Sequence, residues 1–261
     1  MLRNIVAHLR RQDWTAVFIE LVVVVVGVFI GVQASNWNEE RVTNQKAAIF
    51  TERLKADLRV EAWNYEMQVG YSEQVLANAE RAVDALTGRA SLSDEALLIA
   101  TYRATQFNGN TRRRATYDEL TSTGEIGLIR DPELRTLAMD VYTLPIIAQL
   151  EQHGLESAYR SAFRKALPWR VQRALSDKCG DRVVKIGDYD GVKTGLDYPC
   201  ATGLAPDVIA SSAAVLRRDP DLVALLQLRI ADVATDVSNL TTYFASYMRG
   251  PLKRLAQGGE Q

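Results

Sequence analysis

Few side chains in this sequence are of the types that act as nucleophiles, proton shuttles or soft metal ligands. The chain has two histidines, His8 and His153, and two cysteines, Cys179 and Cys200. These counts exclude most histidine-rich and cysteine-rich metal sites. A Ser–His or Cys–His pair would have to use His153. No motif around Gln152-His153-Gly154 makes it a base or a ligand, so we interpret His153 as a structural or exposed histidine.

The two cysteines bracket a segment that is rich in glycine, aspartate and β-forming residues. Residues 182–186 and Val192-Lys193 flank a Gly-Asp-Tyr-Asp-Gly turn, which predicts a small β-hairpin or loop. In an exported domain, Cys179 and Cys200 are expected to form a disulfide, which stabilises a loop of this length by ~3 kcal/mol. The alternative is two free thiols in a reducing compartment.

The turn partly matches a calcium-binding loop. Asp188, Asp190 and Gly191 fit its third, fifth and sixth positions, and Asp197 fits the twelfth. The first position is Ile186, which cannot bind a cation, so these aspartates are better explained as turn residues. Phosphate-binding, nucleophile-elbow, metalloprotease and dinucleotide motifs are also absent from the sequence. We therefore predict no catalytic residue, no metal site and no cofactor.

Charge gives little indication of a partner. Formal net charge is -1, from 31 basic and 32 acidic residues, so nucleic-acid binding is not expected. The run Arg112-Arg113-Arg114 could bind an anionic ligand or headgroup, but such a run in a loop is typical of a solvated surface. The tyrosines and tryptophans mostly recur at helical spacing, which favours core positions.

A membrane segment is the strongest feature of the sequence. Residues 15–34 carry Glu20 as their only charge, and at ~1.5 Å per residue a helix of this length crosses a hydrocarbon core of ~30 Å. Trp14 and Trp37 stand at its ends, as interfacial aromatic residues do. The sequence predicts a cytoplasmic N-terminus over residues 1–14 and a transmembrane helix over 15–34.

Orientation follows from the residues nearest the span. Arg10 and Arg11 precede it, whereas Glu39 and Glu40 follow it, so the N-terminus is predicted inside and the remaining chain outside. A cleavable signal peptide is the alternative, because residues 21–32 could form its apolar core, followed by small residues before a cleavage site.

One face of the predicted span gathers small residues around its carboxylate. At 100° per residue, Glu20, Gly27 and Gly31 lie within about 40° of one direction, with Val24, Ala34 and Asn38. The Gly-x-x-x-Gly spacing permits close helix approach, which predicts a homodimer or a docking face for another envelope membrane protein. Alternatively, these are ordinary membrane-helix glycines and Glu20 reaches the headgroups.

Beyond the span, the pattern predicts an antiparallel helical bundle, so the fold class is all-α with a transmembrane helix and a small disulfide-bracketed loop or hairpin. Apolar residues recur at threes and fours along residues 47–86, indicating one long helix that ends near Thr87-Gly88. Ser91 and Asp94 form a capping-box signature for the next helix, to about Phe107, which a polar loop to Arg114 follows. Further helices are predicted over residues 116–123 with Gly124 as their stop, from Asp131-Pro132 to Pro145, and over 146–175, 206–217 and 220–248, the last ending at Gly250-Pro251. The predicted divisions are 35–176 for the first part of the bundle, 177–205 for the cysteine-bracketed segment, 206–250 for the C-terminal helices and 251–261 for a tail.

Two stretches carry a family resemblance. The first is Glu20-Leu21, Val25-Val26-Gly27-Val28 and Gln33 with Asn36-Trp37-Asn38-Glu39-Glu40-Arg41; the second is Thr116-Tyr117-Asp118-Glu119-Leu120, Ser122, Gly124, Leu128-Ile129 and Leu134-Arg135 to Tyr142. Together they resemble an uncharacterised family of bacterial single-pass inner-membrane proteins, a domain-of-unknown-function family, over most of residues 15–145. From about Pro168 onward the resemblance is absent. It implies an anchored, uncleaved, helical protein with a periplasmic domain, and it makes Glu20 part of the pattern, but it brings no activity or substrate.

The leading hypothesis is therefore a non-catalytic, membrane-anchored interaction or scaffold protein of the bacterial envelope. About 14 residues inside are too few for an output domain, so a signalling role would need a separate transmembrane partner. The alternatives are a ligand-binding, sensor-like helical domain, which predicts a cavity with convergent polar groups, and an enzyme with an unrecognised site.

Overall fold

The computed structural model describes residues 14–109 and 111–258, with side chains from residue 18 onward. Within these residues the secondary structure consists of helices, and no strand is present. The predicted all-α fold is confirmed. The chain divides into two compact units, one up to Glu52 and one from Arg53 onward.

Helix α2 (Trp14–Leu86) belongs to both units. The predicted membrane helix and the predicted long domain helix are thus one helix. Of the apolar residues predicted to face a core between 47 and 86, Leu76 and Leu86 are partly buried and the others are buried. The helix ends where predicted, and Gly88 has a φ of 76°, which permits the chain to turn there.

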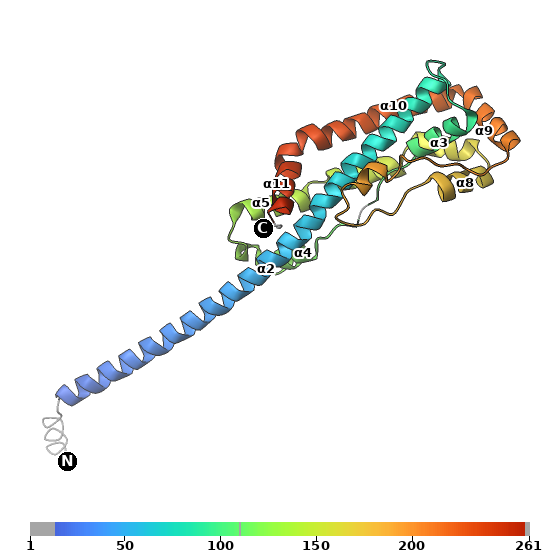
Figure 1. Ribbon diagram of the computed structural model, residues 1–261. Helices are drawn as coiled ribbons and strands as arrows, with labels where there is room; N and C mark the ends of the chain where they lie inside the picture. The colour runs from blue at the N-terminus through green and yellow to red at the C-terminus, as the bar shows by residue number, and fades with distance from the viewer. Residues whose placement is uncertain (1–13, 110, 259–261) are drawn as a thin grey trace, which may run out of the picture. The chain divides into compact units, whose positions relative to one another are not determined.

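A second buried face of α2 was not predicted. Trp63, Met67, Tyr71 and Val75 form a cluster with Val192, Leu196 and Val233, while the end of α2 packs into the main core. Because apolar neighbours lie on more than one side, α2 is the central helix of the second unit (Figure 1).

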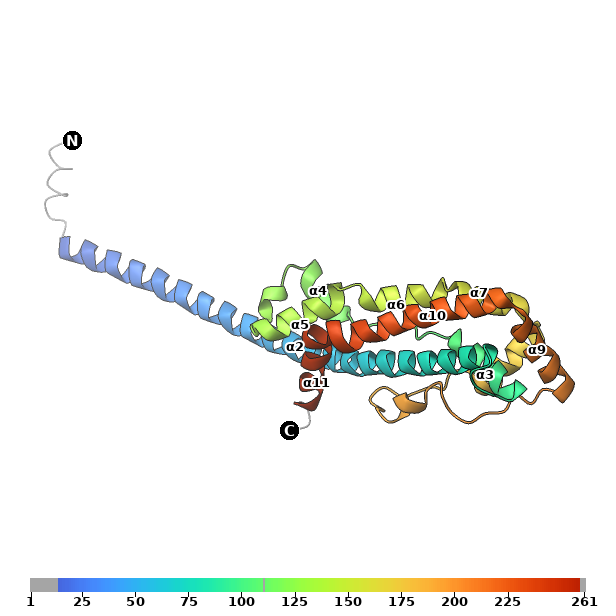
Figure 2. The same ribbon diagram turned by 90° about the horizontal axis from the view of Figure 1, so that it is seen from above.

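The remaining elements of the second unit follow in chain order. They are α3 (Asp94–Ala104), α4 (Ala115–Ser122), the turn η1 (Ile126–Leu128), α5 (Pro132–Thr143), α6 (Ile146–Leu155), α7 (Ala158–Ala166), α8 (Trp169–Cys179), the turn η2 (Gly191–Thr194), α9 (Pro206–Arg218), α10 (Pro220–Ser238), the π-helical turns η3 (Asn239–Tyr243) and η4 (Ala245–Arg249), and α11 (Gly250–Gln257). Helix α10 lies beside α7, and α9 lies against α3 (Figure 2).

Two of the predicted helix ends are confirmed, at Asp131 and at Gly124, whereas the predicted cap of α3 is wrong. The Asp131 side chain accepts hydrogen bonds from the backbone N–H groups of Glu133 and Leu134 at the start of α5. Gly124 follows α4 with a φ of 71°. Helix α3, however, is capped by Ser93, whose Oγ accepts from the Ala96 N–H, and not by Ser91. The two serines lie in one polar turn, and only Ser93 directly precedes the first helical residue.

The long helix predicted over residues 146–175 is wrong. The structure has three helices there, α6, α7 and α8, because Ser157 caps a new helix and Pro168 lacks the N–H that would continue α7.

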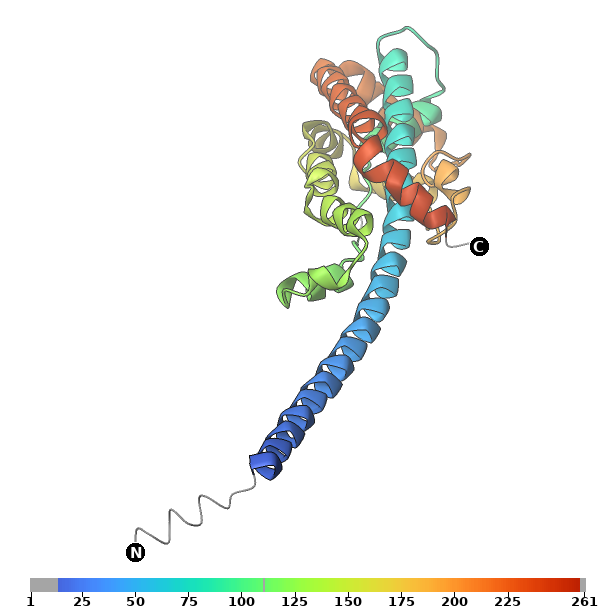
Figure 3. The same cartoon turned by 90° about the vertical axis from the view of Figure 1, so that its left-hand side faces the viewer.

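The predicted stop at Gly250-Pro251 is also wrong. Helix α10 ends at Ser238, π-helical turns continue to Arg249, and α11 begins at Gly250. Proline is tolerated in the first turn of a helix, where its missing N–H has no helical partner. Residues predicted as a tail are therefore helical up to Gln257, and α11 lies beside α2 (Figure 3). Arg249 at the end of η4 and Lys253 of α11 both form ion pairs with Glu66 of α2.

The cysteine-bracketed segment is a loop, and the hairpin alternative is wrong. One backbone hydrogen bond, from the Arg182 N–H to the Gly195 oxygen, joins its two sides, and η2 occupies the expected second strand. The Asp188 carboxylate accepts from the Gly191 N–H and closes the turn locally. Side chains of α2 bind other backbone groups of the loop, so it needs no strand partner.

Candidate functional site

The predicted membrane segment is exposed from residue 18, where the described side chains begin, to its end at residue 34. One helix among the described residues, α2, contains a stretch long and apolar enough to cross a membrane, and no residue in that stretch is buried. Residue 14 belongs to α2, but its side chain and residues 1–13, including the predicted cytoplasmic arginines and His8, lie outside the described residues.

The residues predicted to form a helix–helix interface point away from the described chain. Glu20, Gly27 and Gly31 are exposed, and a Cβ placed on either glycine would meet no atom within 4 Å. Glycine in a helix interior destabilises the helix by about 0.5–1 kcal/mol relative to alanine. Packing within the described chain does not explain why glycine occupies these two positions.

The residues that carry the family resemblance divide between two environments. Trp37, Asn38 and Glu39 are exposed on α2. Tyr117 and Leu120 are buried within α4, and Gly124 forms its left-handed stop. The first group is free to contact a partner or a headgroup, whereas the second group stabilises the fold.

Six polar side chains of α2 recur at threes and fours and lie buried in the second unit. We call Glu61, Asn64, Gln68, Tyr71, Gln74 and Asn78 the polar stripe. The predicted buried face of this helix consists of apolar residues and does not include these polar ones. Their helical spacing was the available signal.

The polar stripe holds the loop between α3 and α4. The Glu61 carboxylate accepts hydrogen bonds from Arg112 Nε at 2.5 Å and from the Arg113 N–H at 2.7 Å. Asn108 Nδ2 donates to Gln68 Oε1. The interpretation of Arg112 as solvated surface is therefore wrong, since its side chain is only 20% exposed and pairs with a buried carboxylate. Arg113 does expose its side chain.

The same stripe holds the cysteine-bracketed loop. Gln74 donates through Nε2 to the Val192 oxygen at 2.7 Å and accepts through Oε1 from the Leu196 and Asp197 N–H groups. The Tyr71 hydroxyl donates to the Asp181 carboxylate at 2.5 Å. Burial, together with the nearby Asp181 charge, raises the pKa of Tyr71, so the phenol stays protonated and remains a donor.

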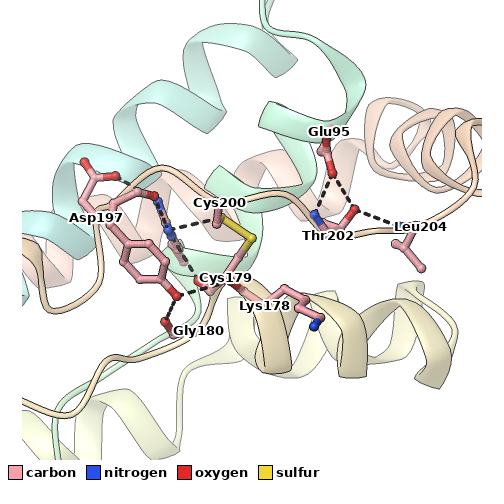
Figure 4. Close-up of a disulfide and its surroundings, with 10 residues drawn as sticks. Glu95, Lys178, Cys179, Gly180, Asp197, Cys200, Thr202 and Leu204 are labelled. Atoms are coloured by element: carbon pink, nitrogen blue, oxygen red, sulfur yellow. Dashed lines mark hydrogen bonds and ion pairs between the residues drawn. A yellow bond between two sulfur atoms is a disulfide. The ribbon is translucent and has the colours of Figure 1, made fainter.

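The predicted disulfide between Cys179 and Cys200 is confirmed, with a Cα–Cα distance of 5.5 Å. It joins the end of α8 to the end of the loop (Figure 4). Beyond it, Thr202 donates through its N–H and hydroxyl to Glu95, which ties the following segment to α3.

Arg103 occupies the space beside the disulfide and is almost fully buried. Its guanidinium donates to the Cys179 oxygen, the Tyr198 oxygen and the Asp197 carboxylate. Burial lowers the pKa of Arg103, and the Asp197 charge opposes that shift. Arg81 also binds Asp197 through both carboxylate oxygens. All of these contacts hold the loop, and none presents a free reactive group.

The aspartates considered as calcium ligands have other partners. Asp188 accepts from the Gly191 N–H, Asp190 pairs with Lys193, and Asp197 pairs with two arginines. No group of three or more histidine, cysteine or acidic side chains in the described residues has the geometry of a metal site. The turn interpretation accounts for the local contacts of Asp188 and Asp190, whereas Asp197 pairs with arginines of α2 and α3.

His153 lies on α6, and its Nδ1 is 3.4 Å from Asp236 on α10. The imidazole is 55% exposed, whereas Asp236 is buried. Burial raises the pKa of the Asp236 carboxyl, and the neighbouring His153 opposes that shift. The pair therefore joins two helices.

Comparison with known proteins finds no matching family model, no matching curated protein and no matching solved structure. The resemblance to the uncharacterised bacterial membrane family stays a prediction, and function has to be argued from the chain itself.

Proposed function

We propose that this chain is a non-catalytic, membrane-anchored interaction protein of the bacterial envelope. Its N-terminus is cytoplasmic, residues 15–34 span the inner membrane, and the helical second unit lies in the periplasm. The observation that carries the proposal is the fully exposed apolar stretch of α2. In water such a stretch would expose large apolar area at roughly 25 cal/mol per Å², whereas lipid removes that cost.

The disulfide supports the proposed compartment. Disulfides persist in the periplasm and are rare in the bacterial cytosol. Both cysteines of the chain are in this bond, so a folded protein has no free thiol.

The membrane face supports association as the mode of action. Gly27 and Gly31 lie on the same helix face as Glu20, and no described atom lies within 4 Å of a Cβ placed at either glycine. Small residues at this spacing let a second helix approach closely, which fits a homodimer or another envelope membrane protein.

Topology is tested with Ser91→Cys, which places a thiol at an exposed loop position. A membrane-impermeant maleimide should label it in intact spheroplasts, and the unsubstituted chain should stay unlabelled. Labelling that requires lysis would contradict the periplasmic placement. The mass of the purified chain distinguishes an anchor from a cleaved signal peptide.

Association is tested by photocrosslinking in native membranes with a photoreactive residue at Gly31 or at Arg113. Arg113 suits this purpose because its backbone makes the loop contacts, donating to Glu61 and accepting from Tyr142, while its side chain is exposed. Capture of the chain itself or of one specific envelope protein supports the proposal. Absence of protein crosslinks above background at both positions would count against it.

A further inference from the structure

A cleft in the second unit lies between the end of α3 and helices α7 and α8. It has a volume of about 710 Å³. Sites for small molecules typically measure about 300–1,000 Å³ and bring a few polar groups together. This α7–α8 cleft is lined by no residue of the predicted membrane face. Gln74 and the loop residues that it binds do not line it either.

Two guanidinium groups on α7 line the cleft one helical turn apart. Arg160 is partly buried, donates through Nη1 to the Thr105 oxygen at 2.8 Å and lies over the Phe107 ring. Arg164 is exposed at the cleft. Within the described part of the chain, neither arginine forms an ion pair, although most other arginines that line pockets or loops do.

The arrangement carries an electrostatic cost that an anion would remove. Like charges four residues apart destabilise a helix even at a surface. Burial lowers the pKa of Arg160, and the Arg164 charge lowers it further. Guanidinium groups bind carboxylate and phosphate oxygens through two parallel hydrogen bonds, so an oxyanion is the complementary ligand.

The cleft also offers an aromatic surface. Trp169, at the start of α8, lines it and is 70% exposed. A large aromatic side chain buries roughly 150–250 Å² when it is covered, so the exposed indole offers a broad apolar contact surface at the cleft. A planar group on the ligand would cover the indole.

We propose that the α7–α8 cleft binds a small carboxylate that carries a planar or aromatic group, with Arg160 and Arg164 holding the carboxylate and Trp169 covering the ring.

The charges of the cleft favour a carboxylate over a phosphate. Arg173 is paired with Asp177, so that pair adds no net charge. Asp181 lines the cleft and accepts from Tyr71, and it offsets one of the two unpaired guanidinium charges. The remaining net charge of the cleft suits a ligand with one negative charge. A phosphate dianion would place excess negative charge beside Asp181.

The test uses the full chain in lipid nanodiscs and ligand-observed NMR titrations with benzoate, acetate and inorganic phosphate. Benzoate should bind saturably at one site, and acetate and phosphate should each bind at least about tenfold more weakly. Arg164→Gln and Trp169→Ala should each weaken benzoate binding at least about tenfold, as expected for loss of a charge-assisted pair or an aromatic anchor. Both side chains are exposed, so both variants should keep the thermal unfolding midpoint of the parent.

Arg170→Gln is the matched control, because it removes an exposed arginine charge beside Trp169 that does not line the cleft. It should change benzoate affinity less than about twofold. Equal effects of Arg164→Gln and Arg170→Gln, phosphate binding as tight as benzoate, or no saturable benzoate binding would each overturn the proposal. None of these results depends on whether the chain associates in the membrane, so this proposal and the proposed function fail separately.

Discussion

Two parts of helix α2 reverse the usual relation between burial and polarity. The stretch around residues 18–32 is apolar and exposed, whereas the stretch 61–78 buries the polar stripe. A helix in water normally buries its apolar face and exposes its polar one. The first stretch therefore matches lipid as its surroundings.

The second stretch shows a different use of the same helix. Buried polar groups are costly unless each has a partner, and four of the six stripe residues bind two loops that have little regular structure. The other two, Asn64 and Asn78, bind groups within α2. One end of α2 is long and apolar enough to cross a membrane. The other end carries buried polar side chains that bind particular loop residues. Removing stripe contacts should therefore be costly, while changing the exposed stretch should leave the fold intact.

Glu61→Ala should have the largest effect on stability. It leaves Arg112 and the Arg113 N–H without their buried acceptor, and breaking a buried ion pair from one side costs about 3–5 kcal/mol. The measurement is the urea midpoint of the purified chain in detergent. Glu80→Ala, an exposed carboxylate on the same helix, is the control and should shift stability by less than about 0.5 kcal/mol. Equal shifts would mean that the stripe does not hold this loop.

Replacing both cysteines by serine should cost about 3 kcal/mol, because the crosslink spans a sequence separation of 21. A reductant should produce the same loss of stability in the parent chain and none in the Cys179→Ser, Cys200→Ser variant. An unchanged urea midpoint would show that Arg103 and Gln74 hold the loop without the crosslink.

Gln74→Ala should release the loop while the disulfide stays closed. It removes the partner of the Val192 oxygen and of two N–H groups, at a cost of about 2 kcal/mol. Trypsin should then cut faster after Lys185, which is exposed, as seen on a reducing gel. Gln149→Ala, at an exposed position on α6, is the control. Identical cleavage rates would contradict the role of Gln74.

Glu66→Gln should cost about 1–2 kcal/mol at pH 7 through its contacts with Arg249 and Lys253. Burial by itself raises the pKa of Glu66, but the two cations outweigh burial, and the pKa is lowered from its ordinary value of 4.5. The stabilisation is therefore present above pH 4.5 and lost as the pH falls through the folded-state pKa.

Urea unfolding of Glu66→Gln and of the parent should consequently converge in acid, as the pH falls below 4.5 and through the lowered folded-state pKa of Glu66. Glu73→Gln, at an exposed position on α2, is the control and should shift stability by less than about 0.5 kcal/mol. A gap between Glu66→Gln and the parent that persists in acid would mean that the substitution acts through packing.

The sequence predicted those features that depend on residues close together. The apolar period of α2, the Asp131 cap and the Gly124 stop are local signals, and the structure confirms them. The docked loops depend on partners far away in the chain, from a separation of 40 for Asn108 with Gln68 to one of 122 for Leu196 with Gln74. A polar residue has the same appearance in a sequence whether water or a loop backbone satisfies it.

The cleft was beyond sequence reasoning for the same reason. Arg160, Arg164 and Trp169 lie near each other in the chain, but whether they face solvent or one shared cavity depends on the break at Pro168. That break was missed when residues 146–175 were predicted as one helix. With α7 and α8 continuous, Trp169 would have no cleft to line.

The smallest effect on folding is expected for Gly27→Leu with Gly31→Leu. A Cβ at either position meets no described atom within 4 Å, so the free energy of unfolding of the second unit should change by less than about 0.5 kcal/mol. Self-association in membranes, measured by energy transfer between labelled chains, should fall at least about tenfold if this face is the contact. Val25→Leu with Val32→Leu adds bulk to other faces of the same stretch and should leave association unchanged. A loss of association in both variants would point to bulk in the membrane as the cause, whereas a loss confined to the glycine variant would identify the Glu20 face as the binding surface.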